Sequence, residues 1–267
     1  MVDFSFKTRY NCYDLVEIME ILRKPSGCPW DAKQTHESIK KNFIEETYEV
    51  VEAINKDDSD LLCEELGDVM MQVVFHAQME KEKGVFDFDD VCDGVCKKLI
   101  ERHPHVFGDV KVDSAEEVLV NWDAIKRKSK NQKTATESML SVPRELPALM
   151  RATKIQKKAA DVGFDWESVD GALDKLGEET QELKDAISCG NKDHIEEEFG
   201  DLLFSAVNVS RFIDTDAEQA LTAASDKFLE RFSKTEQLAK SRNIDMKQAS
   251  LDTLDGLWEE VKSGNSI

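Results

Sequence analysis

The sequence predicts an all-α protein that consists of a tandem repeat of two helical bundles, and three observations lead to this prediction. Only 12 of the 267 residues are glycine and 5 are proline, which is a low content for a chain rich in turns and short strands. Apolar residues recur at spacings of three and four, and no stretch alternates regularly with β-branched residues. Finally, one pattern of acidic residues occurs in both halves of the chain.

The repeated acidic pattern begins at Asn42 in the first half and at Lys175 in the second half. A shift of 133 residues superposes seven identical positions without a gap: Glu45 with Glu178, Glu46 with Glu179, Glu49 with Glu182, Glu64 with Glu197, Glu65 with Glu198, Gly67 with Gly200, and Asp68 with Asp201. Upstream, G-C-P-W-D at 27–31 corresponds to G-F-D-W-E at 163–167 with a shift of 136. Downstream, K-x-x-x-R and then W-x-x-x-K follow in both halves. We interpret this pattern as a tandem duplication.

The duplication divides the chain into an N-terminal domain at 1–127 and a C-terminal domain at 142–267. The polar segment 128–141 is predicted to be a linker, because it has almost no apolar periodicity and is followed by two prolines, at 143 and 147. Each domain is expected to contain four or five helices. An amphipathic helix at 15–22 or 148–160 precedes the two acidic helices, which are separated by turns at 55–60 and 190–193.

The charge balance excludes several classes of protein. There are 55 Asp and Glu against 35 Lys and Arg, a formal net charge of −20, which disfavours binding to nucleic acid or to an anionic membrane surface. No apolar run reaches the ~18 residues of a membrane span, and the first residues lack the features of a secretory signal. The six cysteines form no C-x-x-C pair, so reduced thiols and a cytoplasmic location are expected.

The repeated carboxylates suggest a metal site in each half. On a helix, Glu45, Glu46 and Glu49 fall within an arc of ~100° beside the apolar face, and Glu65 and Asp68 lie one turn apart on the next helix. Such close like charges favour a cation among them, and a shell of oxygen ligands suits Mg²⁺ or Mn²⁺. The glycines at 67 and 200 are predicted to allow close helix approach or ligand access.

Two cationic pairs, Lys98 with Arg102 and Lys227 with Arg231, suggest that the ligand carries phosphates. Lys227 and Arg231 lie one helical turn apart and so project from one face, where they would neutralise phosphate oxygens next to a metal. Trp258 with Lys262 adds an aromatic surface that would stack on a base, although a tryptophan of the core would have the same sequence signal. Together these residues predict a polyphosphate site.

The succession E-E-x-x-E, E-x-x-D and K-x-x-x-R resembles the all-α MazG nucleoside triphosphate pyrophosphohydrolases. The resemblance covers essentially the whole chain and includes the stretches G-C-P-W-D at 27–31, R-H-P-H-V-F at 102–107, L-P-A-L-M-R at 146–151 and V-G-F-D-W at 162–166. It implies Mg²⁺-dependent hydrolysis of ribo- and deoxyribonucleoside triphosphates to the monophosphate and pyrophosphate. It also implies a homodimer in which the C-terminal domain is the catalytic one.

The resemblance also assigns residues. It implies these metal ligands in the C-terminal repeat: Glu179, Glu182, Glu198 and Asp201. A possible second site has their counterparts: Glu46, Glu49, Glu65 and Asp68. The residues expected to bind the nucleotide and its phosphates are Lys175, Glu178, Glu197, Asp201, Lys227, Arg231, Trp258 and Lys262. One departure concerns the position of Lys175, which is Asn42 in the first repeat, and this loss of a cation favours the C-terminal site.

The mechanism expected from these parts is attack of a metal-activated water on the α-phosphorus, with Glu178 as general base. Glu179 is the second residue expected to take part in catalysis. One alternative is a non-catalytic nucleotide-binding module with the same fold. A ferritin-like di-iron protein is disfavoured, because its E-x-x-H motif would require histidine where the chain has Asp68 and Asp201. The histidines at 103 and 105 are expected in a loop set by Pro104 rather than at a metal.

Overall fold

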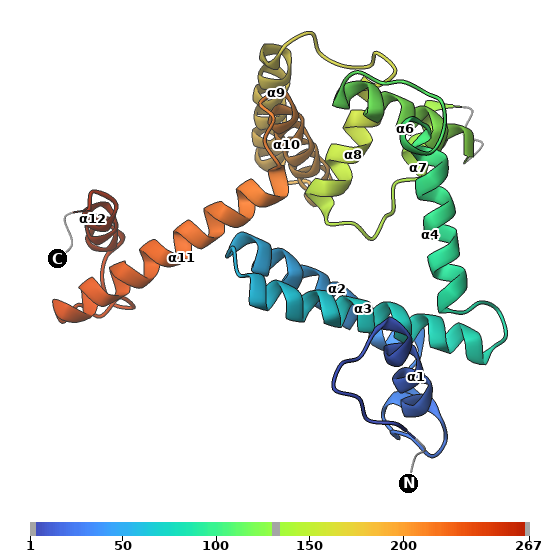
Figure 1. The fold of residues 1–267 in the computed structure, drawn as a ribbon. Coiled ribbons are helices and arrows are strands. Elements are labelled where there is room, and N and C mark those ends of the chain that lie inside the picture. Colours follow the sequence, from blue (N-terminus) through green and yellow to red (C-terminus); the bar gives the residue numbers. More distant parts are fainter. Residues whose placement is uncertain (1–3, 130–133, 265–267) are drawn as a thin grey trace. The chain divides into compact units, whose positions relative to one another are not determined.

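The computed structural model describes residues 4–129 and 134–264, and every regular element in these ranges is a helix, which confirms the all-α prediction (Figure 1). The chain divides into two compact units, at 1–126 and 127–267. The elements of the first unit are α1 (Cys12–Arg23), a 3₁₀ turn η1 (Asp31–Lys33), α2 (His36–Asn55), α3 (Ser59–Glu82), α4 (Phe88–Arg102), α5 (Pro104–Phe107) and α6 (Ala115–Ser129), whose last residues pass the boundary. The second unit contains α7 (Ala135–Leu140), α8 (Ala148–Ala160), α9 (Val169–Cys189), α10 (Lys192–Phe212), α11 (Ala217–Ser241) and α12 (Leu251–Lys262).

The centre of the first unit is the hairpin of α2 and α3, against which α1 packs. The N-terminus of each helix is capped by a side chain that accepts a backbone N–H: Asn11 for α1, Thr35 for α2 and Asp58 for α3. The buried core lies between these three helices and consists of Met19, Ile39, Val74, Phe75 and Met79. This core holds the hairpin in place and so determines which residues of α2 face α3.

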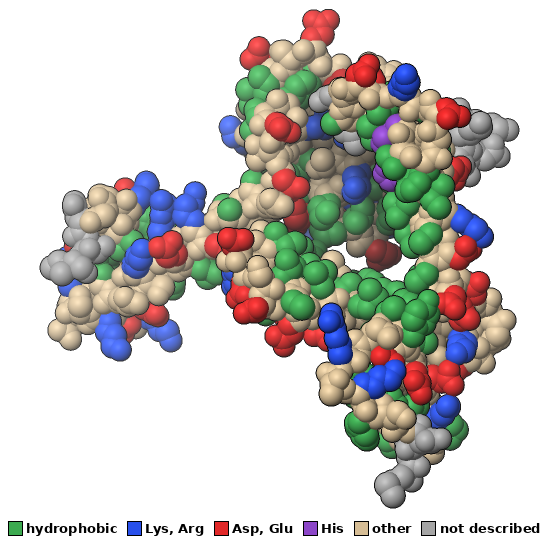
Figure 2. Space-filling model, viewed as in Figure 1, with side chains coloured by type: hydrophobic (Ala, Val, Ile, Leu, Met, Phe, Trp, Pro, Cys, Tyr) green, Lys and Arg blue, Asp and Glu red, His purple; other side chains and the backbone are tan. Residues whose placement is uncertain are grey.

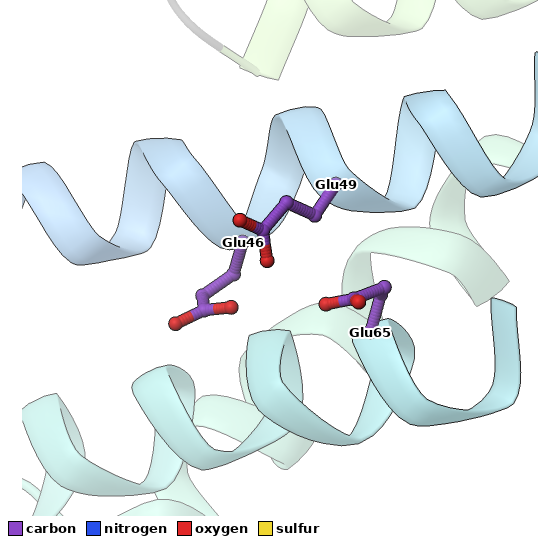
Figure 3. A group of neighbouring side chains, drawn as sticks. All are labelled: Glu46, Glu49 and Glu65. Carbon is purple, nitrogen blue, oxygen red and sulfur yellow. The ribbon is translucent and has the colours of Figure 1, made fainter. Parts of the chain in front are cut away.

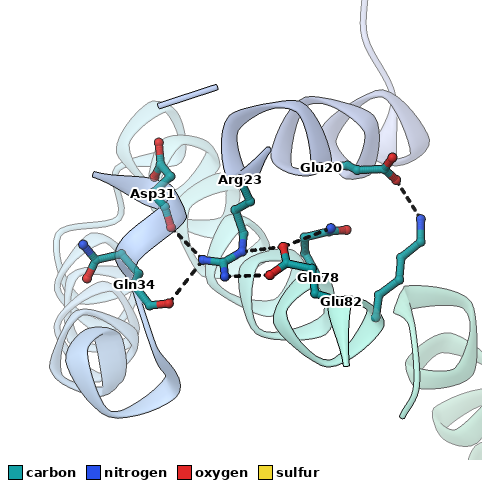
Figure 4. Close-up of polar contacts among 7 residues, drawn as sticks. Glu20, Arg23, Asp31, Gln34, Gln78 and Glu82 are labelled. Atoms are coloured by element: carbon teal, nitrogen blue, oxygen red, sulfur yellow. Dashed lines mark hydrogen bonds and ion pairs between the residues drawn. The ribbon is translucent and has the colours of Figure 1, made fainter. Parts of the chain in front are cut away.

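A buried arginine joins the end of α1 to the rest of the first unit (Figure 4). The guanidinium of Arg23 donates to both carboxylate oxygens of Glu82 at 2.7 and 2.8 Å, and its Nη1 donates to the carbonyl oxygens of Asp31 and Gln34. It also lies 5.2 Å from the centroid of the Phe75 ring. Because the Arg23 side chain is only 6% exposed, this packing fills the space between α1, η1 and α3.

The second unit repeats the order of the first. Its α8, α9 and α10 correspond to α1, α2 and α3, and α9 forms a hairpin with α10 while α8 packs on α10. The hairpin turns at Gly190, whose φ of +71° is the left-handed conformation that ends helices and favours glycine. Helix α11 contacts α8 and α10, and α12 packs against α11, where Trp258 lies 5.2 Å from Phe228.

The structure differs from the sequence prediction in the segment 128–141. We expected a polar linker, but α6 continues to Ser129 and α7 occupies 135–140. A capping box of Thr134 and Glu137 starts α7, and Ser138 is buried and accepts a hydrogen bond from the Lys158 ammonium of α8 at 2.6 Å. A helix therefore forms here although the segment lacks apolar periodicity. The capping box and the contact of Ser138 with Lys158 stabilise it. Residues 130–133 of this segment lie outside the described part.

The two mid-helix glycines are not points of close helix approach. A Cβ atom built at Gly67 or Gly200 would have no heavy atom within 4 Å, apart from its own helix and neighbours. The expected close packing is therefore wrong, and the surface beside each glycine is open. After α4 the sequence predicted a loop at the H-P-H segment, but the structure has the short helix α5 there, with Pro104 at its first position. None of the helices in the described ranges is long and apolar enough to cross a membrane.

Candidate functional site

Three glutamates of the first unit form a carboxylate cluster between α2 and α3 (Figure 3). We call Glu46, Glu49 and Glu65 the first cluster. One carboxylate oxygen of each lies within 4.8 Å of the others. Glu46 and Glu49 come from neighbouring turns of α2, and Glu65 reaches them from α3. Glu65 is 9% exposed, whereas Glu49 is open to solvent, so the cluster has a buried floor and an accessible side.

The first cluster is electrostatically strained. Burial is the main reason why the pKa of the Glu46 carboxyl lies above its ordinary value, and the charges of Asp68 and Glu49 raise this pKa further. A hydrogen bond with Gln72 opposes this rise only in part. The pKa of Glu65 is also raised, first by burial and then by Glu49. A cation would relieve the repulsion between these three carboxylates.

The second unit places the corresponding residues together in the same way. The second cluster is Glu179 and Glu182 of α9 with Glu198 of α10, again with one oxygen of each within 4.8 Å of the others. The Glu179 side chain is 6% exposed and that of Glu198 is 13% exposed. Burial and the charge of Glu179 raise the pKa of Glu182, while Lys175 opposes that rise. The two halves of the duplication therefore contain equivalent carboxylate clusters.

A lysine and a histidine contact the glutamates of the second cluster. The Lys175 ammonium lies 2.7 Å from Oε1 of Glu179 and 2.9 Å from Oε1 of Glu178. These hydrogen bonds raise the pKa of Lys175, so it stays protonated at every physiological pH. His194 Nε2 lies 2.8 Å from Oε1 of Glu198, one turn along α10. The sequence analysis assigned no role to His194, although its spacing of four residues from Glu198 is a signal that would have indicated this contact.

The donor set of both clusters fits a hard divalent cation. Carboxylate oxygens are the ligands that Mg²⁺ and Mn²⁺ prefer, and each cluster offers three within reach of a single ion. In the second cluster, Oε2 of Glu179 is buried and has no hydrogen-bond partner. A buried carboxylate oxygen without a partner carries a large desolvation cost, which coordination of a cation would offset.

Asp68 and Asp201 were expected as fourth ligands, but they are not members of the three-oxygen groups. Glu46 and Glu49, like Glu179 and Glu182, are separated by the same three residues and still share a cluster, so the spacing along the helix does not by itself exclude an aspartate. Asp68 still lies close enough to raise the pKa of Glu46. Each cluster thus consists of the three glutamates among the four predicted carboxylate ligands, without the aspartate.

The other residues predicted to bind the nucleotide are not seen in contact with the second cluster. Lys227 and Arg231 lie on α11, and Trp258 packs on Phe228 of the same helix. The Lys262 ammonium pairs with Glu259 at 3.0 Å, and Glu197 is exposed on α10. Within 134–264, no hydrogen bond or ion pair connects α11 or α12 with the three glutamates. The roles of these residues toward a nucleotide stay predictions.

Comparison with known proteins identifies the family. The model of the MazG nucleotide pyrophosphohydrolase domain matches twice, at residues 34–107 and 167–235, and each match contains one complete carboxylate cluster. The chain belongs to the MazG family. The two matches also account for the duplication, because each MazG domain contributes one hairpin with its cluster.

Several MazG relatives align over nearly the whole chain. The nucleoside triphosphate pyrophosphohydrolase/pyrophosphatase MazG of Thermotoga maritima is 47% identical over 94% of this chain and 96% of its own length. The nucleoside triphosphate pyrophosphohydrolase of Escherichia coli K12 is 46% identical over 93% of this chain and 95% of its own length. The uncharacterized protein YabN of Bacillus subtilis is 49% identical over 92% of this chain, which corresponds to 50% of that longer protein.

Proposed function

We propose that this protein hydrolyses ribo- and deoxyribonucleoside triphosphates to the monophosphate and pyrophosphate, with Mg²⁺ or, as a substitute, Mn²⁺. The observation that carries the proposal is the second cluster, which has a buried and unpartnered carboxylate oxygen on Glu179. The relatives from Thermotoga maritima and Escherichia coli, which align over more than nine-tenths of the chain, are named nucleoside triphosphate pyrophosphohydrolases, which supports the hydrolysis of nucleoside triphosphates.

The residues of the second unit would divide the work as follows. Glu179, Glu182 and Glu198 would hold Mg²⁺, which when bound supplies polarisation of phosphate oxygens and a lowered pKa for a coordinated water. Glu178, whose side chain is 57% exposed next to Glu179, would accept the proton of the water that attacks the α-phosphorus.

Lys175 would hold the charge of the phosphates. In the structure its ammonium bridges Glu178 and Glu179, so it is already aimed at the cluster and permanently charged. When phosphate oxygens arrive, the ammonium would exchange one carboxylate partner for a phosphate, which is a charge-assisted hydrogen bond of similar strength. Asn42 stands at this position in the first repeat. For this reason we assign catalysis to the second cluster.

A direct test compares two matched double variants. Glu179→Gln/Glu182→Gln and Glu46→Gln/Glu49→Gln each remove two carboxylates at equivalent positions. Wild type with Mg²⁺ and ATP or dATP should yield monophosphate and pyrophosphate, resolved by ion-exchange chromatography. The variant of the second cluster should lose at least about 100-fold in rate, about 2.7 kcal/mol of transition-state stabilisation, whereas the variant of the first cluster should stay within about threefold.

The products also separate this function from the alternatives. Diphosphate and free phosphate would place the attack at the γ-phosphorus and contradict the proposal. Nucleotide binding without any product would instead support a non-catalytic nucleotide-binding module.

A homodimer and a cytoplasmic location remain predictions. Exposed hydrophobic side chains on α2 and α3 of the first unit support a further partner surface, among them Tyr48 and Leu66, each 51% exposed (Figure 2). Such a continuous apolar surface is typical of protein interfaces. Light scattering at several protein concentrations would measure the oligomeric state directly, and a monomer at all concentrations would contradict the dimer.

A further inference from the structure

Two histidines and a glutamate of the first unit form a chain of hydrogen bonds between α2 and α3. His36 is the first residue of α2, and His76 and Glu80 lie one turn apart on α3. Nδ1 of His36 lies 2.7 Å from Nδ1 of His76, and Nε2 of His36 lies 2.6 Å from Oε1 of Glu80. The Lys83 ammonium donates to the same Glu80 oxygen at 2.6 Å. We call His36, His76 and Glu80 the imidazole chain.

The two imidazole rings meet edge to edge through their nitrogens. They are parallel to within 5°, and their centroids are 5.0 Å apart. This is the largest centroid distance that two imidazoles with nitrogens 2.7 Å apart can have, so both nitrogens lie on the line between the ring centres. Such an arrangement is a straight hydrogen bond between two ring nitrogens. The ring of Phe43 packs against His76 at a centroid distance of 5.8 Å and restricts its movement.

The hydrogen bonds limit how many protons the imidazole chain can hold. A neutral imidazole has one donor and one acceptor nitrogen, whereas an imidazolium has two donors. Because the Glu80 carboxylate only accepts, Nε2 of His36 carries a proton. When both rings are neutral, His76 donates to His36; when His36 is an imidazolium, it donates to His76. A second added proton would leave two N–H groups and two positive charges facing each other at 2.7 Å, so it would break this bond.

The surroundings of the two rings also oppose the second proton. Burial is the main reason why the pKa of His76 lies below its ordinary value, and the charge of His36 lowers this pKa further. The Glu80 carboxylate stays ionised, because hydrogen bonds from Lys83 and then His36 lower its pKa, but Lys83 also neutralises part of its charge. Other charged side chains of α2, and those that join α1 to α3, are paired: Glu37 with Lys40, Arg23 with Glu82, and Glu20 with Lys81.

The second unit has apolar residues at the equivalent positions. With the shift of 133 residues, His36 corresponds to Val169, His76 to Val209 and Glu80 to Ile213. Val169 is also the first residue of its helix, α9. These three side chains do not titrate, so the pH leaves their contacts unchanged. The two units therefore differ in how the first turn of the hairpin is held.

We propose that the imidazole chain is an acid-sensitive latch, which holds the first turn of α2 on α3 and opens when both histidines are charged. The unfolded chain binds the second proton more tightly than the folded unit does, because the pKa of His76 is lowered from 6.5 on folding. The stability that the latch supplies is therefore complete above pH 6.5 and is lost as the pH falls below it. This device belongs to the first unit alone and does not depend on the proposed function.

Hydrogen exchange of the full chain, measured by mass spectrometry at pH 7.5 and pH 5 with a chelator present, tests the latch. The double variant His36→Val/His76→Val gives the first unit the two valines of the second unit. His105→Val is the matched control, because it removes a histidine of the same unit that lies outside the imidazole chain. The peptide at the start of α9 is an internal control in every protein. Protection is corrected for the intrinsic exchange rate at each pH.

Between pH 7.5 and pH 5, protection of the first turns of α2 should fall at least about fivefold more in wild type than in the double variant. His105→Val should behave as wild type does, and the α9 peptide should change less than about twofold in all three proteins. The carboxyls of the first cluster titrate in both wild type and the double variant, so the comparison cancels their effect. An equal pH dependence in these two proteins would overturn the proposal.

A second measurement needs no variant and so does not depend on how the double variant folds. In wild type with ¹⁵N-labelled histidine, NMR should detect a scalar coupling between the Nδ1 atoms of His36 and His76 at pH 7.5. The coupling should disappear at the pH where the ring shifts show that both have become imidazolium. Absence of the coupling at pH 7.5, or independent titration of the two rings at the ordinary pKa of 6.5, would contradict the latch.

Discussion

The first and second clusters occupy equivalent positions of the duplicated hairpin but have different surroundings. In the second unit, Lys175 neutralises Glu179. In the first unit, Asn42 replaces the lysine. Because both units contain three glutamates in this arrangement, the cluster alone does not distinguish a nucleotide site from a metal site. We propose that the neighbouring Lys175 makes that distinction.

The same comparison suggests a division of roles between the units. An uncompensated carboxylate cluster gains more from a cation than one that already has a lysine, because the repulsion it relieves is larger. We propose on this basis that the first unit binds a cation in a structural role and that the second unit binds the substrate.

The largest expected effect comes from removing the arginine that fills the first unit. Arg23→Ala leaves two carbonyl oxygens and the Phe75 ring without their partner, so the first unit should lose about 2–3 kcal/mol of stability. Thermal unfolding measures this loss. The matched control is Arg242→Ala, because the Arg242 side chain is 47% exposed in its ion pair with Glu260 and should cost less than about 0.5 kcal/mol. Equal shifts for the two variants would show that Arg23 does not support the fold.

Exchanging Lys175 and Asn42, which occupy equivalent positions in the two repeats, should have the next largest effect. Lys175→Asn gives the second cluster the neighbour found in the first repeat and should lower kcat/KM about 10- to 100-fold through the loss of a phosphate cation. Asn42→Lys places an ammonium beside the first cluster and should weaken Mg²⁺ binding there without changing the rate. Steady-state kinetics and calorimetry with Mg²⁺ alone measure the two effects. An unchanged kcat/KM in Lys175→Asn would remove our reason for assigning catalysis to the second cluster.

The smallest expected effect is the pH dependence of the metal-free first cluster. The pKa of Glu65 is raised above its ordinary 4.5, mainly by burial and then by Glu49, so the folded unit binds this proton more tightly than the unfolded chain does. The contribution of Glu65 to stability is therefore present at low pH and is lost as the pH rises through the raised pKa. In the presence of a chelator, the melting temperature of wild type minus that of Glu65→Gln should fall as the pH rises from 4.5 through the raised pKa, and added Mg²⁺ should reduce this slope. A difference that rises with pH would contradict the electrostatic account.

The sequence was sufficient to predict the hairpins and their glutamates, because helical periodicity and a gapless repeat place Glu46 and Glu65 on facing turns. It did not predict that Asp68 and Asp201 lie outside the groups of three carboxylate oxygens, because the same spacing of three residues joins Glu46 with Glu49 inside such a group. The contact between His194 and Glu198 was missed although it is a local helical pair, four residues apart.

Other features depend on packing that no local pattern shows. Helix α7 lies in a segment without apolar periodicity, and the contact of Ser138 with Lys158 of α8 holds it in place. The glycines at 67 and 200 face open space, which the sequence cannot distinguish from close helix approach. In the second unit, Ala159 lines a cavity of about 460 Å³ at a position where the first repeat has the buried Arg23, and only a comparison of the two packed units shows this difference.

We propose that only the second cluster binds nucleotide. Equilibrium dialysis of the full chain with Mg²⁺ and α,β-methylene ATP counts the sites directly. We expect one bound nucleotide per chain. This binding should be lost in Glu179→Gln/Glu182→Gln and retained in Glu46→Gln/Glu49→Gln. Two nucleotides per chain, or loss of binding in the variant of the first cluster, would contradict it.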